Sequence, residues 1–294
     1  MSFSSEVKTE LCRRLKTDSG CCARAAAYGV LLYANRFSQD LTRIVTENDM
    51  FAAIIPELMK SAFGVEIDGS SVFGRMAKTA LIIESRSKIN KLFNTIGYET
   101  EYDPALHINL GMMECDDCRN AFVRGAFLSG GSVTDPTKRY HLEMVTTHYY
   151  VHRETLALLR ELDIDAKSSV RNGTYMLYLK RSGEIEDALT LMGAPLSAMA
   201  MMNAKLEKEL RGRVSRRVNC DVANAGRMVN AAAEQLEVIR RLQKEGSLSL
   251  LTEPLQAAAA LRLKYPEASL AELAAYSGVS KSGLAHRFKK IMQT

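Results

Sequence analysis

Residues 116–132 read DDCRNAFVRGAFLSGGS. Apolar and small residues recur in this stretch at helical spacing and a double glycine follows, which predicts a helix that ends at Gly130 and Gly131. Gly125 lies in the middle of the predicted helix, where a glycine costs about 1 kcal/mol of helix propensity. We therefore expect a second backbone to pass very close to Gly125.

The same pattern occurs earlier in the chain at a constant offset of 96 residues. Three pairs of identical residues show this offset: Gly29 and Gly125, Cys22 and Cys118, and Ala25 and Ala121. The offset returns in segments 81–97 and 177–193, where an apolar triplet and a helical pattern are followed by glycine. A helix and the sheet that follows it are therefore expected twice, in a pseudo-twofold domain whose glycine helices pack at the axis.

Each half is predicted to contain a helix, a strand, a helix, two strands and a helix. In the first half we expect helices at 21–33, 49–63 and 87–96, with strands at 41–46, 65–67 and 79–84. In the second half the helices after the glycine helix are expected at 148–162 and 183–192, with strands at 140–146, 167–171 and 174–180. Asn48 is a suitable N-cap for helix 49–63, and Gly64 is a suitable stop.

Two such halves resemble the LAGLIDADG fold of homing endonucleases. When the motif of that family is laid on VRGAFLSGG and AYGVLLYAN, its glycine falls on Gly125 and Gly29, and its catalytic acid falls on Gly130 and Ala34. In those endonucleases a carboxylate from each helix end holds a divalent cation, because hard cations need oxygen ligands. Both acids are missing here. The resemblance therefore implies the fold without catalysis, and we predict no catalytic residues and no enzyme.

One alternative is that carboxylates farther along the chain replace the missing catalytic acids. Asp40 and Asp135 follow the two helix ends by several residues. A metal-dependent endonuclease that uses such displaced carboxylates predicts magnesium-dependent nicking of DNA that disappears in Asp135→Asn.

Four of the six cysteines lie at the starts of the glycine helices: Cys21, Cys22, Cys115 and Cys118. Small thiols pack well at such positions, and this is the simpler interpretation. The sharper interpretation is a zinc site shared across the pseudo-twofold, since a structural zinc site needs four ligands. We assign no metal or cofactor from the sequence.

The chain has no long apolar run and no basic-then-apolar leader, so we expect a cytoplasmic protein with reduced thiols and no membrane contact.

Charge divides the 294 residues into two parts. Residues 1–204 contain 23 basic and 25 acidic residues, a balance of −2, whereas residues 205–294 contain 16 and 9, a balance of +7. A polyanion is therefore expected to bind the second part. Segment 205–219, KLEKELRGRVSRRVN, is predicted to be a basic linker. Its arginines either are solvated or contact phosphates: Arg211, Arg213, Arg216 and Arg217.

The remainder of the chain is predicted to be helical and to end in a helix-turn-helix. Helices are expected at 221–244 and up to Lys264, with Pro254 in the first turn of the latter. In SLAELAAYSGVSKSGLAHRFKKI, Ser269 and Glu272 form a capping box, Gly278 supplies the turn and Ser280 caps the second helix. The apolar core of the motif is predicted to consist of Leu273, Ala274, Val279, Leu284 and Phe288.

The polar residues of this motif are the candidates for DNA contact. Lys281 and Ser282 at the start of the second helix are expected to enter the major groove, and His286 to reach a base edge or a phosphate. Lys289 and Lys290 are expected to hold the DNA backbone. The complete set of candidates within 269–290 is Ser269, Ser280, Lys281, Ser282, His286, Arg287, Lys289 and Lys290. The alternative is a small helical bundle with a solvated basic face.

The combination of the two parts resembles the WhiA family of bacterial sporulation and cell-division regulators. The resemblance rests on the paired cysteines, RGAFLSGGSV, YHLE, RVNCDVANAGRMVNAAAEQLEVIRRL and GVSKSGLAHRFKK, and it covers nearly the whole chain. It implies an α+β fold with a degenerate LAGLIDADG-like domain at 1–204, built from repeats at about 1–100 and 101–204, followed by the linker and by a helix-turn-helix domain at 220–294.

The resemblance also implies a function. The family consists of DNA-binding transcriptional regulators that associate with the nucleoid and act in cell division, chromosome segregation and, in some bacteria, sporulation. We expect double-stranded DNA to be the partner of the helix-turn-helix. With its balance of −2, the first domain is expected to bind a protein, such as another transcription factor or RNA polymerase, at least as readily as DNA. A third hypothesis is a structural nucleoid protein that binds any duplex with a steep salt dependence.

Overall fold

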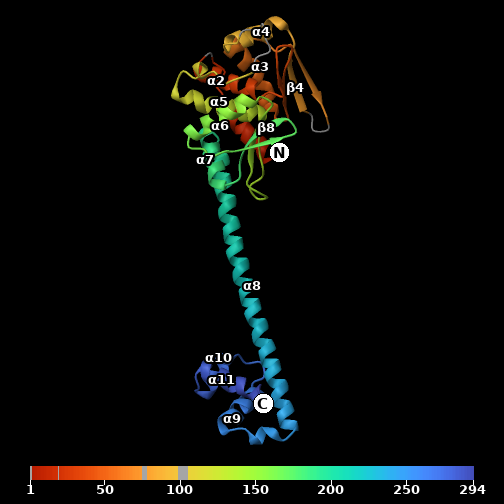
Figure 1. Ribbon diagram of the computed structural model, residues 1–294, viewed down its shortest axis with the longest axis vertical. Coiled ribbons are helices and arrows are strands. Elements are labelled where there is room, and N and C mark those ends of the chain that lie inside the picture. The colour runs from red at the N-terminus through yellow and green to blue at the C-terminus, as the bar shows by residue number, and fades with distance from the viewer. Residues whose placement is uncertain (1, 19, 75–77, 99–104) are drawn as a thin grey trace. The chain divides into compact units, whose positions relative to one another are not determined.

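The computed structural model describes residues 2–18, 20–74, 78–98 and 105–294 (Figure 1). The chain divides into two compact units, Met1–Lys208 and Glu209–Thr294. The first unit combines helices with two sheets, and the second contains helices only. The predicted α+β fold with a helical C-terminal part is confirmed.

The first half of the first unit places helices around a four-stranded antiparallel sheet. Its elements are α1 (Phe3–Arg14), α2 (Cys21–Leu32), β1 (Arg36–Phe37), β2 (Thr42–Thr46), α3 (Asp49–Phe63), β3 (Gly69–Phe73), β4 (Lys78–Ile83) and α4 (Arg86–Thr95). The strand order is β1-β2-β4-β3. Alternate residues of β2 are buried, and Ile44 pairs with Leu81 of β4. Because side chains alternate along a strand, one face of the sheet packs on the helices.

The second half repeats this arrangement. Its elements are η1 (Leu110–Met112), α5 (Asp116–Gly130), β5 (Gly131–Val133), β6 (Leu142–Thr146), α6 (Tyr149–Glu161), β7 (Lys167–Arg171), β8 (Thr174–Leu179) and α7 (Ser182–Met192). The order β5-β6-β8-β7 is the counterpart of the first sheet, strand for strand. Apolar residues from both halves form one continuous core. The predicted internal repeat is therefore confirmed.

Helices α2 and α5, which we call the helix pair, lie side by side (Figure 1). A Cβ atom at Gly125 would lie 1.9 Å from the carbonyl oxygen of Ala26, and one at Gly29 would lie 2.2 Å from the carbonyl oxygen of Phe122. Real Cβ atoms do not approach oxygen this closely, so only glycine allows the contact. The close approach predicted at Gly125 is confirmed, and Gly29 makes the matching contact from the other repeat.

The boundaries of α3 follow the predicted chemistry. The side chain of Asn48 accepts a hydrogen bond from the backbone N–H of Phe51 at 2.9 Å. Gly64 follows the helix in the left-handed conformation, with φ of 60°, and its N–H donates to the carbonyl oxygen of Lys60. An oxygen-bearing N-cap and a left-handed glycine satisfy backbone groups that helix ends leave unpaired.

The strand predicted at 65–67 is wrong, because the strand that pairs with β4 is β3 at Gly69–Phe73. All five residues of β3 are exposed, so no alternation of apolar and polar residues marks it in the sequence. Val65 is buried because it packs into the core directly after α3. A buried loop residue thus produced the strand-like signal.

The predicted basic linker is also wrong as a separate segment, because residues 205–219 lie inside α8 (Pro195–Lys244), a single helix of 50 residues. Gly212 and Gly226 interrupt neither the helix nor its register. Each glycine costs about 1 kcal/mol of helix propensity, but the lysine, glutamate, leucine and arginine around them are among the best helix formers. The boundary between the two units falls within this helix.

The second unit contains the end of α8 followed by η2 (Ser247–Leu250), α9 (Glu253–Lys264), α10 (Leu270–Ser277) and α11 (Lys281–Ile291). It has its own core, composed of Ile239, Leu242, Ala258, Ala259, Leu273, Leu284, Phe288 and Ile291. Among the helices of the described residues, none combines the length and apolar character that crossing a bilayer requires.

Candidate nucleic-acid interface

The predicted helix-turn-helix is formed by α10 and α11, and its turn is fixed by caps. The hydroxyl of Ser269 accepts a hydrogen bond from the N–H of Glu272 at 3.1 Å, and the Glu272 carboxylate accepts one from the N–H of Ser269 at 2.7 Å. The hydrogen bond that the carboxylate accepts from the Ser269 backbone is the main cause of the lowered pKa of Glu272. Gly278 adopts a left-handed φ of 66°, and the Ser280 hydroxyl accepts from the N–H of Gly283 at 3.2 Å. The capping box and the turn are confirmed.

The inner faces of α10 and α11 follow the prediction with one exception. Leu273, Leu284 and Phe288 are buried at 0–1% exposure in the core of the second unit. Ala274 is half-buried and packs against that core. Val279 was expected to fill the space between the helices, but it is only half-buried and lies outside the core cluster. The anchors of α11 are therefore Leu284, Phe288 and Ile291.

Arg262 is a supporting residue that the sequence analysis missed. Its side chain is 2% exposed, its Nε donates to the side-chain oxygen of Gln235 at 3.0 Å, and its guanidinium lies 5.3 Å from the centre of the Phe288 ring. The guanidinium also donates to the carbonyl oxygens of Pro266 and Ala268. Burial lowers the pKa of Arg262. This side chain ties α8, α9 and the loop before α10 to the helix that is expected to read DNA.

Helix α11 presents a basic outer face. Lys281, Ser282, His286, Lys289 and Lys290 are exposed, whereas Arg287 is half-buried. Within the described chain, none of the ion pairs involves these basic residues. Ser269 and Ser280 serve as helix caps, so their hydroxyl oxygens are already engaged with backbone N–H groups.

Lys281 carries a positive charge at a position where such a charge does not stabilise α11. It occupies the first helical position, and the N-terminal end of a helix carries partial positive charge. Lys289 and Lys290 in the last turn, by contrast, complement the helix dipole. Lys281 also lines a hollow of about 400 Å³ with Ser269 and Arg227. Arg227 could not be singled out from the sequence, because only folding brings it to the same hollow as Lys281.

The four arginines of segment 205–219 are exposed on α8. Since consecutive helical residues are about 100° apart around the axis, Arg213, Arg216 and Arg217 share one side of the helix. Arg211 points away from that side. A regular helix thus presents three arginines along one line, which a flexible linker would not do.

The ends of the helix pair contain no carboxylates at the positions of the endonuclease acids. Ala34 is 3% exposed, and a Cβ atom at Gly130 would lie 2.5 Å from the carbonyl oxygen of Val145. The displaced carboxylates are engaged locally: Asp40 accepts from Arg36 at 2.7 Å, and Asp135 accepts from the hydroxyl of Thr137 at 2.6 Å. The hydrogen bond from Thr137 lowers the pKa of Asp135. The pKa of Asp40 is lowered mainly by a hydrogen bond from the Ser38 hydroxyl and to a smaller extent by Arg36.

The starts of the helix pair bring together the four cysteines named from the sequence. Cys21 and Cys22 begin α2, and Cys115 and Cys118 lie at the start of α5. They form the only group of three or more cysteine, histidine or acidic side chains in the described residues whose ligand atoms could share one metal ion. The nuclease positions and the thiols thus lie at opposite ends of the same two helices.

Comparison with known families and proteins gives a consistent result. A family model described as the WhiA C-terminal HTH domain matches residues 214–294, and one described as the WhiA LAGLIDADG-like domain matches residues 119–211. A curated protein from Clostridium botulinum, named probable cell division protein WhiA, is 33% identical over 99% of this chain and 96% of its own length. A relative of the same name from Ruminiclostridium cellulolyticum is 36% identical with the same coverage.

Solved structures support the same fold. The crystal structure of full-length DUF199/WhiA from Thermatoga maritima matches with a TM-score of 0.59 and 23% identity, covering 100% of this chain and 97% of the other. The N-terminal LAGLIDADG domain of DUF199/WhiA matches with a TM-score of 0.50 and 21% identity, covering 65% of this chain and 92% of the other. At this level of identity the likeness concerns the fold.

Proposed function

Because the chain belongs to the WhiA family, we propose that it is a sequence-specific DNA-binding transcriptional regulator that acts in cell division. The names of the curated relatives support the role in cell division, and the matched HTH domain supports the binding of DNA. We extend the proposal to chromosome segregation, to sporulation in some bacteria, and to a location at the nucleoid in the cytoplasm.

The observation that carries this proposal is the outer face of α11. A helix whose inner face is anchored by Leu284 and Phe288 presents lysines and a histidine that form no ion pairs within the described chain. Capped ends and the tight turn at Gly278 hold that face in a defined orientation. A preorganised basic helix of this kind fits the major groove of duplex DNA.

Individual side chains receive different roles. Lys281 and Ser282, at the start of α11, are assigned to base edges, and His286 one turn later to a base edge or a phosphate. Lys289 and Lys290 are assigned to the DNA backbone, which fixes the register without reading sequence. Arg287 is half-buried, so we assign it a phosphate contact at the edge of the interface.

The arginine line of α8 supports a further set of phosphate contacts. Arg213, Arg216 and Arg217 project from one side of a regular helix and are exposed. Each phosphate that a basic residue neutralises releases counterions and steepens the salt dependence of binding. Removing one such arginine should weaken binding to all sequences about equally and reduce the salt slope by about one.

For the LAGLIDADG-like unit we propose a role in binding without catalysis. Its acid positions hold Ala34 and Gly130, and Asp40 and Asp135 are each engaged by neighbouring side chains. Residues 1–204 carry a balance of −2, which does not favour tight binding of DNA. This unit is better suited to contact a protein, such as another transcription factor or RNA polymerase.

The proposal is tested by recovering bound DNA across the genome with the intact protein and with a Lys281→Ala, His286→Ala variant. We expect the intact protein to yield a short shared sequence and the variant to lose it, since a good base contact contributes about 1–3 kcal/mol of discrimination. Lys244→Ala is the matched control, because it removes one exposed lysine from the end of α8. The control should retain the shared sequence.

Two outcomes would overturn the proposal. Broad coverage of the genome by the intact protein, with no shared sequence, would indicate a nucleoid-coating role. A shared sequence that survives in the Lys281→Ala, His286→Ala variant would place sequence recognition outside α11.

A further inference from the structure

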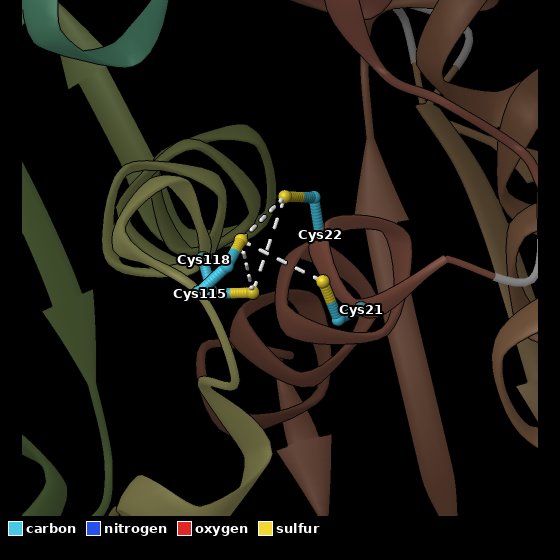
Figure 2. A group of neighbouring side chains, drawn as sticks. All are labelled: Cys21, Cys22, Cys115 and Cys118. Atoms are coloured by element: carbon cyan, nitrogen blue, oxygen red, sulfur yellow. Dashed lines mark hydrogen bonds between the residues drawn. The ribbon is translucent and has the colours of Figure 1, made fainter.

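Four thiols converge where the helix pair begins. Cys21 and Cys22 occupy the first two positions of α2, Cys115 is the N-cap of α5, and Cys118 lies in the first turn of α5 (Figure 2). Each repeat therefore contributes two sulfurs, from segments that are about 93 to 96 residues apart in the sequence. Cys118 is buried, Cys21 and Cys22 are half-buried, and Cys115 is exposed.

The distances between the sulfur atoms are those of ligands around one ion. The Sγ atom of Cys115 lies 3.4 Å from that of Cys118, 3.5 Å from that of Cys22 and 3.6 Å from that of Cys21. The Sγ atoms of Cys118 and Cys22 are 3.9 Å apart, and all four lie within 4.8 Å of one another. Four sulfurs at about 2.3 Å from a tetrahedral zinc ion are about 3.8 Å apart.

The same distances differ from those of disulfides. A disulfide joins its sulfurs at about 2.05 Å, and all four cysteines are free. Several of the pairs also come from different helices that are held together by the glycine contact in their middle. The four thiols are therefore placed by the fold, without a covalent bond between them.

We propose that Cys21, Cys22, Cys115 and Cys118 bind a single structural zinc ion that joins the starts of the two repeats. Thiolate is a soft ligand, and a closed set of four thiolates in tetrahedral arrangement is typical of structural zinc. With all four positions filled by protein, the site leaves no open position for water or substrate. Its role is to hold α2 against α5. It lies at the opposite end of the helix pair from the positions that hold the catalytic acids in related nucleases.

The surroundings favour the negative charge that such a site carries. Four thiolates and one Zn²⁺ have a net charge of −2, and all four sulfurs lie at the N-terminal ends of α2 and α5, where the helix dipoles stabilise anions. Arg124 lines the same hollow as Cys22. Arg24, which follows Cys22 by two positions, has a buried Nε without a hydrogen-bond partner in the described part of the chain. Glu114 pairs with the other end of the Arg24 guanidinium at 2.6 Å.

A first experiment measures metal in the full-length protein, purified under reducing conditions without added metal and analysed by mass spectrometry. We expect about one zinc per chain and negligible iron. Replacement with Co²⁺ should give the visible absorption of tetrahedral cobalt thiolate. Zinc and cobalt that fail to bind, or iron with acid-labile sulfide in place of zinc, would overturn the proposal.

Variants locate the site. A Cys115→Ser, Cys118→Ser variant should lose the bound zinc, whereas Cys220→Ser should retain it, because Cys220 is exposed on α8 and remote in sequence from the four thiols. Zinc that persists at about one per chain in the double variant would place it elsewhere and contradict the proposal.

Thiol accessibility provides a test that does not depend on any variant. In the zinc-bound protein a thiol reagent should modify about one cysteine rapidly, Cys220, since Cys12 is buried and the other four are ligands. A strong chelator should raise this count to about four, because Cys118 is buried like Cys12. A count of four before chelation would show that no metal protects Cys21, Cys22 and Cys115.

Discussion

The two ends of the helix pair differ in what they can bind, although the same two helices form both. The starts of α2 and α5 bring together four thiols within 4.8 Å of one another, whereas the positions of the nuclease acids at their ends hold Ala34 and Gly130. Hard cations need carboxylates and soft ones prefer thiolates. The comparison shows that the fold supplies positions at both ends of a helix pair and that the side chains present there determine which metal ions each end can bind.

Helix polarity explains part of this difference. Anions are stabilised at the N-terminal ends of helices and destabilised at the C-terminal ends. Two carboxylates at the C-terminal ends of adjacent helices also repel each other unless a cation lies between them. A chain with no catalytic use for that cation is therefore more stable with small neutral residues such as Ala34 and Gly130.

The largest expected effect on stability comes from a substitution that separates α2 and α5 at the middle of the helix pair. Gly125→Ala places a methyl group 1.9 Å from the carbonyl oxygen of Ala26. The nearest atoms all belong to the backbone of Ala26 and cannot rotate away, so the helices must move apart. We expect a loss of more than about 4 kcal/mol in the free energy of unfolding, measured by urea denaturation. Gly226→Ala is the control, since a Cβ atom there meets nothing within 4 Å and should stabilise α8 by up to about 1 kcal/mol. Equal stability of the two variants would contradict the backbone contact.

Removal of metal tests the start of the helix pair. If zinc is present at about a thousand times its dissociation constant, it stabilises the folded chain by about 4 kcal/mol, and a chelator should remove most of this. We expect the melting temperature of the intact protein to fall on chelation and that of Cys118→Ser to be low with or without chelator. An identical melting temperature of the intact protein with and without chelator would argue against a structural role for the site.

Restoring acids tests the opposite end. Gly130→Asp introduces a Cβ atom 2.5 Å from the carbonyl oxygen of Val145, and overpacking of this kind costs about 1–3 kcal/mol. We expect an Ala34→Asp, Gly130→Asp variant to be less stable and to show no magnesium-dependent nicking of supercoiled DNA. Gly69→Asp serves as the control for the added charge, because a Cβ atom at Gly69 meets nothing within 4 Å. Efficient nicking by the double variant would show that the catalytic geometry persists.

The smallest effect concerns a carboxylate that the first unit uses for structure. Asp68 accepts hydrogen bonds from Lys88 and from the N–H groups of Glu84 and Ser85, and these lower its pKa from 3.8 to about 2. Because the folded pKa is below the unfolded one, the contribution of Asp68 is present above pH 3.8 and is lost as the pH falls towards 2. Asp68→Asn should reduce stability at pH 7 by under about 1 kcal/mol, since the group is partly solvated, and should flatten the acid side of the stability profile.

The control for that measurement is Asp187→Asn. The side chain of Asp187 is exposed on α7 and forms no hydrogen bond or ion pair that the structure shows among the described residues. Its replacement should change stability at pH 7 by no more than about 0.5 kcal/mol. Matching pH profiles for the two variants would mean that the contacts of Asp68 contribute nothing measurable.

The parts of the fold that could be predicted are those in which local chemistry and tertiary structure agree. Gly125 costs helix propensity and is therefore informative, and the offset of 96 residues identified its partner Gly29 without knowledge of the fold. The caps at Asn48 and Ser269 were also predictable, because the oxygen of the side chain and the N–H that it accepts from are close in sequence. The helix-turn-helix was predictable for the same reason, because its caps and its turn at Gly278 are formed by residues that are close in sequence.

The parts that were missed depend on contacts between distant residues or carry no apolar pattern. Strand β3 is exposed along its whole length and is held by hydrogen bonds to β4, which leave no trace in composition. From the sequence alone, Arg262 would be taken for an exposed basic residue. Only the folded structure brings Gln235 and Phe288 into contact with it. Convergence of the four thiols could be suspected from two cysteine pairs, but only the packing of α2 on α5 brings the sulfurs within reach of one ion.

The arrangement of the four cysteines also bears on the history of the gene. Cys22 and Cys118 correspond under the offset of 96 residues, but the counterpart of Cys21 is Asp117, and no cysteine in the first repeat corresponds to Cys115. A homodimer of one ancestral repeat would carry every thiol twice in symmetric positions, so it could not present this set. The present set therefore belongs to the fused, duplicated gene, in which each copy was free to change alone, and a single polypeptide carries all four thiols whatever its state of association.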